Sequence, residues 1–348
     1  MRGGTLFSTP LRGRKLSNKV FNHVPPNPEP SPQQGFALLT VLMIVALIAM
    51  MGSQLLYEQY TNIKRSSHMM HQAQSFAVQW GVEAWVKKGL KLDLEDNNYD
   101  GLNDAWQAPF GPIPYEGGEL SAKLVDLNSR LNLNNVVAQE EEQRRAWLRI
   151  IKRYAEQNAL STRFADVTAD WIDADDSPRS SGAESNTYLL LKPAYSAANQ
   201  PMVMLSELKL MDGLQRIEYD VWQVLENDLT TLPTVTKINV NTAEQRVLMA
   251  LADWLDEAVV SAWIAQRLSE PARKIDVFID FLVEAKGMPR QEIKKGLPDW
   301  MVSVQSDYFL LKTQVNYGES QQGLSAIFSR HPDNQNEVRL VQRWLNAE

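Results

Sequence analysis

The chain has 348 residues, of which 35 are Lys or Arg and 42 are Asp or Glu, so its formal net charge is −7. This acidic balance argues against a protein that binds nucleic acid over a broad surface, because phosphate contacts need a positive field. Cysteine is absent, which excludes disulfides, thiolate nucleophiles and Cys-ligated zinc or iron–sulfur centres. The sequence also lacks glycine-rich phosphate loops and the nucleophile motif GxSxG, and we expect a protein that is not an enzyme.

The first predicted element is a membrane-spanning helix over residues 36–57, a stretch without a charge. A helix of this length measures about 33 Å at ~1.5 Å per residue, close to the thickness of the hydrocarbon core of a bilayer. Residues 1–35 carry five basic residues and one acid, which favours a cytoplasmic N-terminus and an exported remainder. The prolines of this leader are expected to prevent a helix there.

Gly35 stands directly before Phe36, where the basic leader meets the apolar run. A small residue at this junction resembles the processing site of type IV prepilins and pseudopilins. In that family a prepilin peptidase cuts after the glycine on the cytoplasmic side and leaves the apolar helix attached. The resemblance therefore implies cleavage between Gly35 and Phe36. The fifth residue of the mature chain is normally Glu in that family, and here it is Thr40.

Helical spacing continues beyond the predicted span. Lys87, Lys88 and Gly89 are typical of a helix stop, so we expect one helix over residues 36–88, followed by a polar loop at 91–104. Apolar residues recur in its second half at intervals of three and four, which predicts one stripe packed on a globular domain: Ala73, Phe76, Ala77, Trp80 and Ala84.

Downstream, the periodicity predicts two strand-rich parts separated by a helical part. Strand signals occur at 120–133 and return at 302–304, 308–317, 323–330 and 338–345. Helices are expected between them, at 140–158, 161–172, 205–211, 217–226, 243–254, 257–268, 275–284 and 289–294. The expected fold class is α+β, in which a long N-terminal helix packs on an antiparallel sheet and a large all-α domain is inserted between strands.

Several local sequences resemble the K-class minor pseudopilins of type II secretion, a family that also lacks the glutamate at position five. They occur here in that family's order: DLNSRLNLN at 126–134, DWIDADD at 170–176, GAE at 182–184, SEL at 206–208 and INVNTA at 238–243. The resemblance implies a prepilin-type leader at 1–35, an N-terminal helix at 36–90 that spans the membrane at 36–57, a sheet domain at 91–136 and 300–348, and an inserted helical domain at 137–299.

The same resemblance implies a function and partners. The chain would be a minor pseudopilin at the tip of the pseudopilus, where it helps to initiate and cap the filament that exports folded proteins across the outer membrane. The implied partners are the I- and J-class minor pseudopilins, the prepilin peptidase and the inner membrane, with the C-terminal bulk in the periplasm and no nucleic acid. Two alternatives stay open: a membrane-tethered DNA-binding protein of a competence system, and a type IV pilus minor pilin.

Two of the family-like sequences also have purely structural interpretations. The polar side chains of 126–134 are expected to bind their own backbone in a hairpin turn, as determinants of the fold. In 238–243, Asn241 or Thr242 is expected to cap the helix that follows. This segment also resembles the entry of helix-hairpin-helix units, some of which bind the DNA backbone. Its hairpin position at 252–257, however, holds three acids and no glycine.

Two acidic loops are candidate calcium sites. In the first, Asp96, Asn98, Asp100 and Gly101 match the opening of an EF-hand loop, whereas Gln107 replaces the closing glutamate. A solvated turn is the alternative there. The stronger candidate follows Trp171, and its predicted calcium ligands are Asp173, Asp175, Asp176 and Glu184.

Proline and glycine between these four acids argue against a helix and allow the carboxylates to converge on a hard cation. The alternative is a solvated loop whose aspartates cap helices. The family resemblance favours calcium, because K-class members carry it in the helical domain.

Overall fold

The computed structural model describes residues 32–115, 117–318, 320–331 and 337–346. The chain divides into two compact units, residues 1–66 and 67–348. Most of the predicted leader, residues 1–31, lies outside the described residues.

The described part of the first unit is helical and belongs to α1 (Pro32–Asp96). The helix begins at Pro32, so the prediction that prolines exclude helix throughout the leader is wrong at its last residues. Proline is tolerated in the first turn because its missing N–H would have no helical partner there. The large apolar side chains from Phe36 to Tyr57 are all exposed. Within the described residues, α1 is the one helix long and apolar enough to cross a membrane.

In the second unit α1 continues to Asp96, so its predicted end at Lys88 is wrong. Leu90 is only 1% exposed and belongs to the core between the helix and the sheet. Burying this side chain outweighs the roughly 1 kcal/mol that a helical glycine costs relative to alanine. Gly89 therefore remains inside the helix.

The buried face of α1 in this unit is not the predicted one. Gln79 and Glu83 are buried, together with Val82. Gln79 donates a hydrogen bond to the carbonyl of Gln322 at 3.3 Å. Glu83 forms a 2.5 Å ion pair with Arg343 of the sheet. Because the sheet supplies these partners, the more polar side of the helix faces inward.

The predicted apolar stripe consequently lies on the outside of α1. Trp80 is 56% exposed, and the three alanines within two turns of it along the same face are also exposed. Of the predicted stripe, only Phe76 is half-buried. We call this exposed surface the outer stripe: Ala73, Ala77, Trp80 and Ala84.

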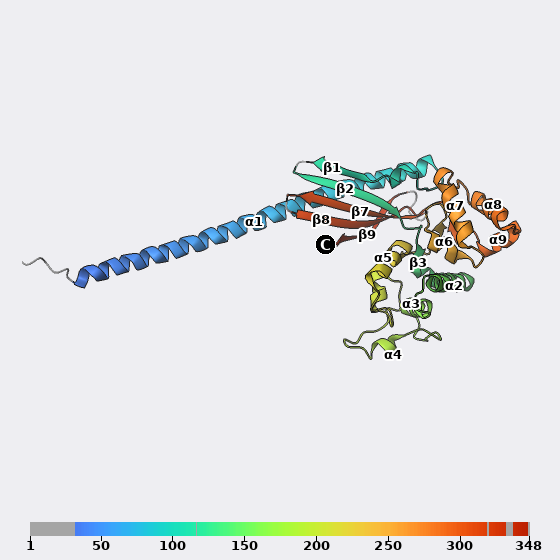
Figure 1. Ribbon diagram of the computed structural model, residues 1–348, viewed down its shortest axis with the longest axis horizontal. Helices are drawn as coiled ribbons and strands as arrows, with labels where there is room; N and C mark the ends of the chain where they lie inside the picture. Colours follow the sequence, from blue (N-terminus) through green and yellow to red (C-terminus); the bar gives the residue numbers. More distant parts are fainter. Residues whose placement is uncertain (1–31, 116, 319, 332–336, 347–348) are drawn as a thin grey trace, which may run out of the picture. The chain divides into compact units, whose positions relative to one another are not determined.

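Five antiparallel strands form the main sheet of the second unit, in the order β1-β2-β7-β8-β9 (Figure 1). Asp126 at the end of β2 lies opposite Phe309 at the start of β7, although the two are far apart in sequence. The chain therefore leaves the sheet after β2 and returns to it at β7, as the sequence predicted. The strands are β1 (Phe110–Tyr115), β2 (Gly118–Asp126), β7 (Tyr308–Tyr317), β8 (Ser320–Ser329) and β9 (Arg339–Asn346).

Alternate residues of the central strands build the core beneath α1, since successive side chains of a strand point to opposite faces. Val82 and Leu90 of the helix pack there against residues of three strands. On the opposite face a smaller cluster surrounds Tyr308 and Leu310. The strand residues in the core under α1 are Leu120, Ala122, Leu124, Phe309, Leu311, Val315, Leu324, Ala326 and Phe328.

Strand β1 is absent from the sequence prediction. Its sequence, FGPIPY, contains two prolines that cannot donate to a strand ladder, which favours a loop. The strand lies at the edge of the sheet, where prolines are tolerated. Gly111 has φ +104°, and a Cβ there would approach the carbonyl oxygen of Leu120 to 2.4 Å, so the position requires glycine.

Between β2 and β7 the chain forms the predicted helices, which gather at one end of the sheet (Figure 1). A single buried cluster unites them, in which Trp147 and Trp263 are at most 1% exposed. The predicted helix at 205–211 is a 3-10 helix, and the short α4 was not expected. The helices are α2 (Glu141–Gln157), α3 (Phe164–Ile172), α4 (Ser185–Tyr188), η3 (Leu205–Leu210), α5 (Tyr219–Asp228), α6 (Gln245–Leu251), α7 (Glu257–Ser269), α8 (Ile275–Lys286) and α9 (Arg290–Gly296).

The predicted strand at 120–133 stops at Asp126 and is followed by a turn and by β3 (Leu131–Asn132). Two pairs of very short parallel strands tie the helical region together, β3 with β4 (Leu229–Thr230) and β5 (Ile238–Asn239) with β6 (Val302–Ser303). The domain boundaries that we expected at 137 and 299 stay a prediction.

Six buried asparagines surround these short strands, and each binds backbone groups of a segment distant in sequence. All are at most 3% exposed. We call the group the asparagine junction: Asn128, Asn132, Asn134, Asn135, Asn239 and Asn241.

Asn132 and Asn135 hold the segment 231–237, which has no regular structure of its own. Asn132 accepts a hydrogen bond from the amide of Leu232 at 3.0 Å and donates one to the carbonyl of Thr234 at 2.9 Å. Asn135 does the same for both backbone groups of Thr236, at 2.9 and 2.8 Å. A side-chain amide offers the same donor and acceptor as a peptide group, so these residues replace a missing partner strand.

Asn128 ties the junction to the main sheet. Its Oδ1 accepts from the amides of Asp307 and Tyr308 at 3.0 and 3.1 Å, and its Nδ2 donates to the carbonyl of Lys237 at 3.0 Å. The Asp126 carboxylate accepts from the Asn128 amide at 2.7 Å, which is the predicted turn contact. The predicted hairpin is wrong, because β3 pairs with β4 and not with β2. The turn contact is present, but most bonds of these side chains reach segments that are distant in sequence.

Asn135→Ala should destabilise the protein strongly. The change leaves both buried backbone groups of Thr236 without partners, and each unpaired group costs about 1–3 kcal/mol. We expect a clear fall in the unfolding midpoint of the purified chain, followed by circular dichroism in urea. Asn103→Ala is the matched control, because Asn103 is exposed and makes a single bond, to the carbonyl of Leu268. Equal losses of stability in the two variants would contradict the prediction.

Candidate metal site

The loop after Trp171 is organised around one arginine. The guanidinium of Arg179 pairs with Asp170 at 2.5 Å and with Asp173 at 2.6 Å. Its backbone amide also donates to the Asp170 carboxylate, at 3.1 Å. Asp170 lies on the buried side of α3 and is 0% exposed. The first acid of the family-like sequence DWIDADD therefore anchors the loop from inside.

Gly182 allows the returning part of the loop to pass directly over Asp170. A Cβ at this position would lie 1.7 Å from Oδ2 of Asp170, so only glycine fits. Arg163 fixes the same turn by donating to the carbonyls of Ser181 and Gly182, at 3.0 and 3.2 Å. These contacts bring Glu184, two residues further on, back towards the beginning of the loop.

Three of the four predicted ligands come together. Asp173, Asp175 and Glu184 each present a carboxylate oxygen within 4.8 Å of the other two. Asp175 is exposed and Asp173 is half-buried, whereas Glu184 is 1% exposed. The structure does not bring Asp176 into this group. Its carboxylate instead accepts a hydrogen bond from Asn199 at 3.1 Å.

The cluster contains buried oxygens without a donor. Both carboxylate oxygens of Glu184 and Oδ1 of Asp173 have no hydrogen-bond partner among the described residues. Burial, and then the charges of the neighbouring aspartates, raise the pKa of Glu184 to about 7. Burial also raises the pKa of Asp173, although Arg179 opposes the shift. Arg179 alone therefore does not compensate the negative charges of the cluster.

A divalent cation would bind the carboxylate oxygens that lack a donor in the described part of the chain, and it would offset the repulsion between the negative charges. The donors are all carboxylate oxygens on a non-helical loop, which is the hard and flexible ligand set that calcium prefers. Magnesium suits the loop less well, because it demands a strict octahedron and retains its waters. Asp173, Asp175 and Glu184 would hold the ion, and its role there would be to tie the loop to α3 and α4.

Asn199 contacts both ends of the segment 171–176 beside this cluster, and the sequence analysis missed it. It has φ +46°, a left-handed conformation that asparagine tolerates better than most residues. Its amide donates to the carbonyl of Trp171 at 3.0 Å, and its buried Oδ1 has no partner among the described residues. The only sequence signal would have been an asparagine two residues before Pro201, which is too common in turns to be specific.

The second candidate loop, at 96–107, uses its acids in a different way. Asp100 is 0% exposed, is paired with Arg330 and accepts from the amide of Ser306 at 2.8 Å. Asp104 accepts from the amide of Gly101 at 2.7 Å. Asp96 is the exposed last residue of α1. Within the described residues these acids form no second metal-binding group.

The segment 238–243 is part of the asparagine junction. Asn241 exchanges two 2.9 Å hydrogen bonds with the backbone of Ala272. Asn239 donates to Ser306 and to the carbonyl of Asp100. The expected helix cap is wrong, because α6 starts at Gln245 and Glu244 precedes it. Both asparagines are buried, so they do not face a DNA backbone as the helix-hairpin-helix alternative requires.

A long N-terminal helix packed on an antiparallel sheet, with a helical region inserted between neighbouring strands, defines a pilin-like subunit. Comparison with known proteins identifies the family within this class. The family model "Type II secretion system (T2SS), protein K" matches in two parts, residues 129–234 and 238–297. The type II secretion system protein K of Pseudomonas aeruginosa is 30% identical over 322 residues, which cover 89% of this chain and 92% of that protein. The chain belongs to the type II secretion system protein K family and is a minor pseudopilin.

Other relatives extend this comparison. The protein K of Pectobacterium carotovorum is 27% identical and covers 83% of this chain and 90% of its own length. The crystal structure of the GspK–GspI–GspJ complex from the enterotoxigenic Escherichia coli type 2 secretion system contains a chain of the same fold. That chain aligns over its whole length with 82% of this one, at a TM-score of 0.70 and 22% identity. The predicted family and fold class are confirmed, and membership of this family replaces the two alternatives.

Proposed function

We propose that this chain is the tip subunit of the pseudopilus and that it assembles with the minor pseudopilins I and J. It is anchored once in the inner membrane, with its bulk in the periplasm, and it acts by assembly rather than by catalysis. The single observation that carries this proposal is the outer stripe of α1, an apolar helix face that its own sheet does not cover.

The outer stripe has the composition of a helix-packing surface. Three alanines let a second helix approach closely, and Trp80 adds a large apolar contact. Exposed apolar surface of this kind marks an interaction site. In the GspK–GspI–GspJ complex the partners of a chain with this fold are the proteins I and J. Helices of the same class are therefore the proposed occupants here.

Two features support a position at the tip. The whole region between Asp126 and Tyr308 stands outside the sheet as an insertion, and its bulk would collide with neighbours inside a closely packed shaft. Thr40 also lacks the carboxylate that would neutralise the N-terminal amine of a subunit above it. Its hydroxyl donates to the carbonyl of Ala37 at 2.9 Å, so it brings no unpaired group into the bilayer.

We also propose that Asp173, Asp175 and Glu184 bind calcium and that the ion is structural. The support is the convergence of three carboxylates and the absence of donors to Glu184 among the described residues. Calcium would hold the loop from 173 to 184 in one conformation on the surface of the helical region.

Trp80→Glu should weaken assembly with the I and J pseudopilins while leaving the fold intact. We expect the apparent affinity to fall by at least about tenfold, since interface tryptophans often contribute roughly 2 kcal/mol or more. The measurement is co-purification of the detergent-extracted full chain with co-expressed I and J proteins. Gln74→Glu is the control, because it adds the same charge to an exposed position of α1 outside the outer stripe. Full retention of both partners by Trp80→Glu would contradict the proposal.

Calcium should raise the thermal midpoint of the full chain, and Glu184→Gln should abolish this effect. At a calcium concentration of about a hundred times Kd, linkage supplies roughly 2.7 kcal/mol, enough to move the midpoint by several degrees. In chelator, Glu184→Gln should be no less stable than the parent protein, because it removes a buried charge that repels its neighbours. Glu156→Gln, on the exposed side of α2, should keep the full calcium response. An unchanged midpoint on adding calcium to the parent protein would overturn the site.

The mature chain should begin with Phe36. The proposed prepilin peptidase needs a small residue before the cut, so Gly35→Glu should leave the leader attached. Intact-mass spectrometry of the membrane-extracted protein measures both results. A mature N-terminus near Gly52 would contradict the proposal, because it would identify residues 36–51 as an ordinary cleaved signal peptide.

A further inference from the structure

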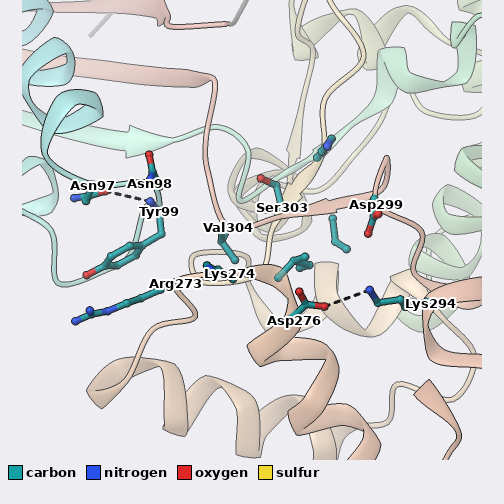
Figure 2. Close-up of a pocket in the computed structure, with 13 residues that line it drawn as sticks. Asn97, Asn98, Tyr99, Arg273, Lys274, Asp276, Lys294, Asp299, Ser303 and Val304 are labelled. Atoms are coloured by element: carbon teal, nitrogen blue, oxygen red, sulfur yellow. Dashed lines mark hydrogen bonds and ion pairs between the residues drawn. The ribbon is translucent and has the colours of Figure 1, made fainter. Parts of the chain in front are cut away.

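A hollow of about 630 Å³ opens in the second unit (Figure 2). Its walls come from the turn after α1, the residues before α8, helix α9 and strand β6. Neither the outer stripe nor the loop from 173 to 184 contributes to it. Its size is that of a ligand pocket rather than of a site for one small ion.

The charge of this hollow is opposite to that of the chain. Four cationic side chains line it, Lys237, Arg273, Lys274 and Lys294, against the two acids Asp276 and Asp299. The 313 residues that follow Gly35 contain 30 basic and 41 acidic residues, since 5 of 35 bases and 1 of 42 acids lie in the leader. A concave positive patch on a negative protein concentrates the field and attracts anions.

Three of these cations form no salt bridge with any residue that the structure describes. Lys294 pairs with Asp276 at 3.2 Å, as the dashed line in Figure 2 shows. Lys237, Arg273 and Lys274 are exposed, and none of the three forms a salt bridge among the residues that the structure describes. Lys237 nevertheless lies close enough to Asp307 for its charge to oppose the rise in the pKa of that carboxyl. Because all three side chains are exposed, their charges are available to a ligand.

Arg273 is held in position for such a ligand. Its guanidinium lies 6.0 Å from the centre of the Tyr99 ring, within the range of a cation–π contact. Figure 2 shows the two side chains next to each other, with Asn97 nearby, and the acids Asp276 and Asp299 on the other side of the hollow. A guanidinium placed in this way presents a planar fork that fits a carboxylate with two hydrogen bonds.

We propose that this hollow binds an acidic segment of a partner protein through two or more of its Asp or Glu side chains. The same three cations supply the charge, Tyr99 gives an apolar wall for the peptide chain, and Asn97, Asn98 and Ser303 provide groups that hydrogen-bond a backbone. A partner docked here would contact the helical region and the end of α1 together. The inference is independent of the position of the subunit in the filament.

The test uses the full chain in detergent and a short fluorescein-labelled oligo-glutamate peptide, with binding followed by fluorescence anisotropy. The parent protein should bind the peptide, and affinity should fall steeply with added NaCl. The triple variant Lys237→Gln, Arg273→Gln, Lys274→Gln should lose about tenfold or more, roughly what three partly screened ion pairs contribute. Arg273→Lys should lose less, because it keeps the charge and removes only the fork.

The matched control carries the same change of charge at exposed positions outside the hollow: Lys91→Gln, Arg149→Gln and Lys152→Gln. It should retain at least about half of the affinity, because distant surface charges are screened. Equal losses in the two triple variants, or no binding by the parent protein, would overturn the proposal. Displacement of the peptide by inorganic phosphate at equal concentration, or tighter binding of single-stranded DNA, would identify a different ligand and overturn it as well.

Discussion

The fold depends on the exchange of hydrogen bonds between buried asparagine amides and backbone segments that have no strand or helix of their own. A region of this size, inserted between β2 and β7, must be held in place at the point where the chain leaves the sheet and where it returns. Asn128 binds both sides of that point, because it contacts Tyr308 at the start of β7 and Lys237 within the insertion. An unpaired buried amide or carbonyl is costly, so these bonds specify a single arrangement of the short strands around them.

The charged side chains that are buried follow the same rule, because a buried charge is also costly when it has no partner. Arg330 is 6% exposed and pairs with Asp93 of α1 at 2.8 Å and with Asp100. Arg330 thereby pairs with one acid in the last turn of α1 and with one in the turn that follows it. The loop from 173 to 184 differs, because Arg179 pairs with Asp170 and Asp173 but leaves Glu184 without a donor among the described residues. The proposed calcium ion would supply the missing positive charge there, whereas the hollow beside Arg273 holds more cationic than acidic side chains.

Periodicity predicted the helices and most of the sheet because the burial of one face repeats at 3.6 or 2 residues. It could not predict which side of α1 faces inward. The alanines and Trp80 form the more apolar stripe, but Gln79 and Glu83 find their partners Gln322 and Arg343 on strands that are more than 240 residues away in sequence. The candidate metal site was predictable as far as Asp173, Asp175 and Glu184, which a single loop brings together. The sequence could not predict that Asp176 stays outside the cluster, because its partner Asn199 lies 23 residues further along the chain.

Amide hydrogen exchange tests the central claim about the asparagine junction most directly. The amides of Leu232 and Thr236 lie in a segment without regular structure, and each is bonded to an asparagine side chain. In the purified full chain, these two amides should exchange as slowly as those in the centre of β7, because they open only when the insertion unfolds. Exchange as fast as that of exposed loop amides would contradict the account, since it would show that the asparagines do not hold the segment.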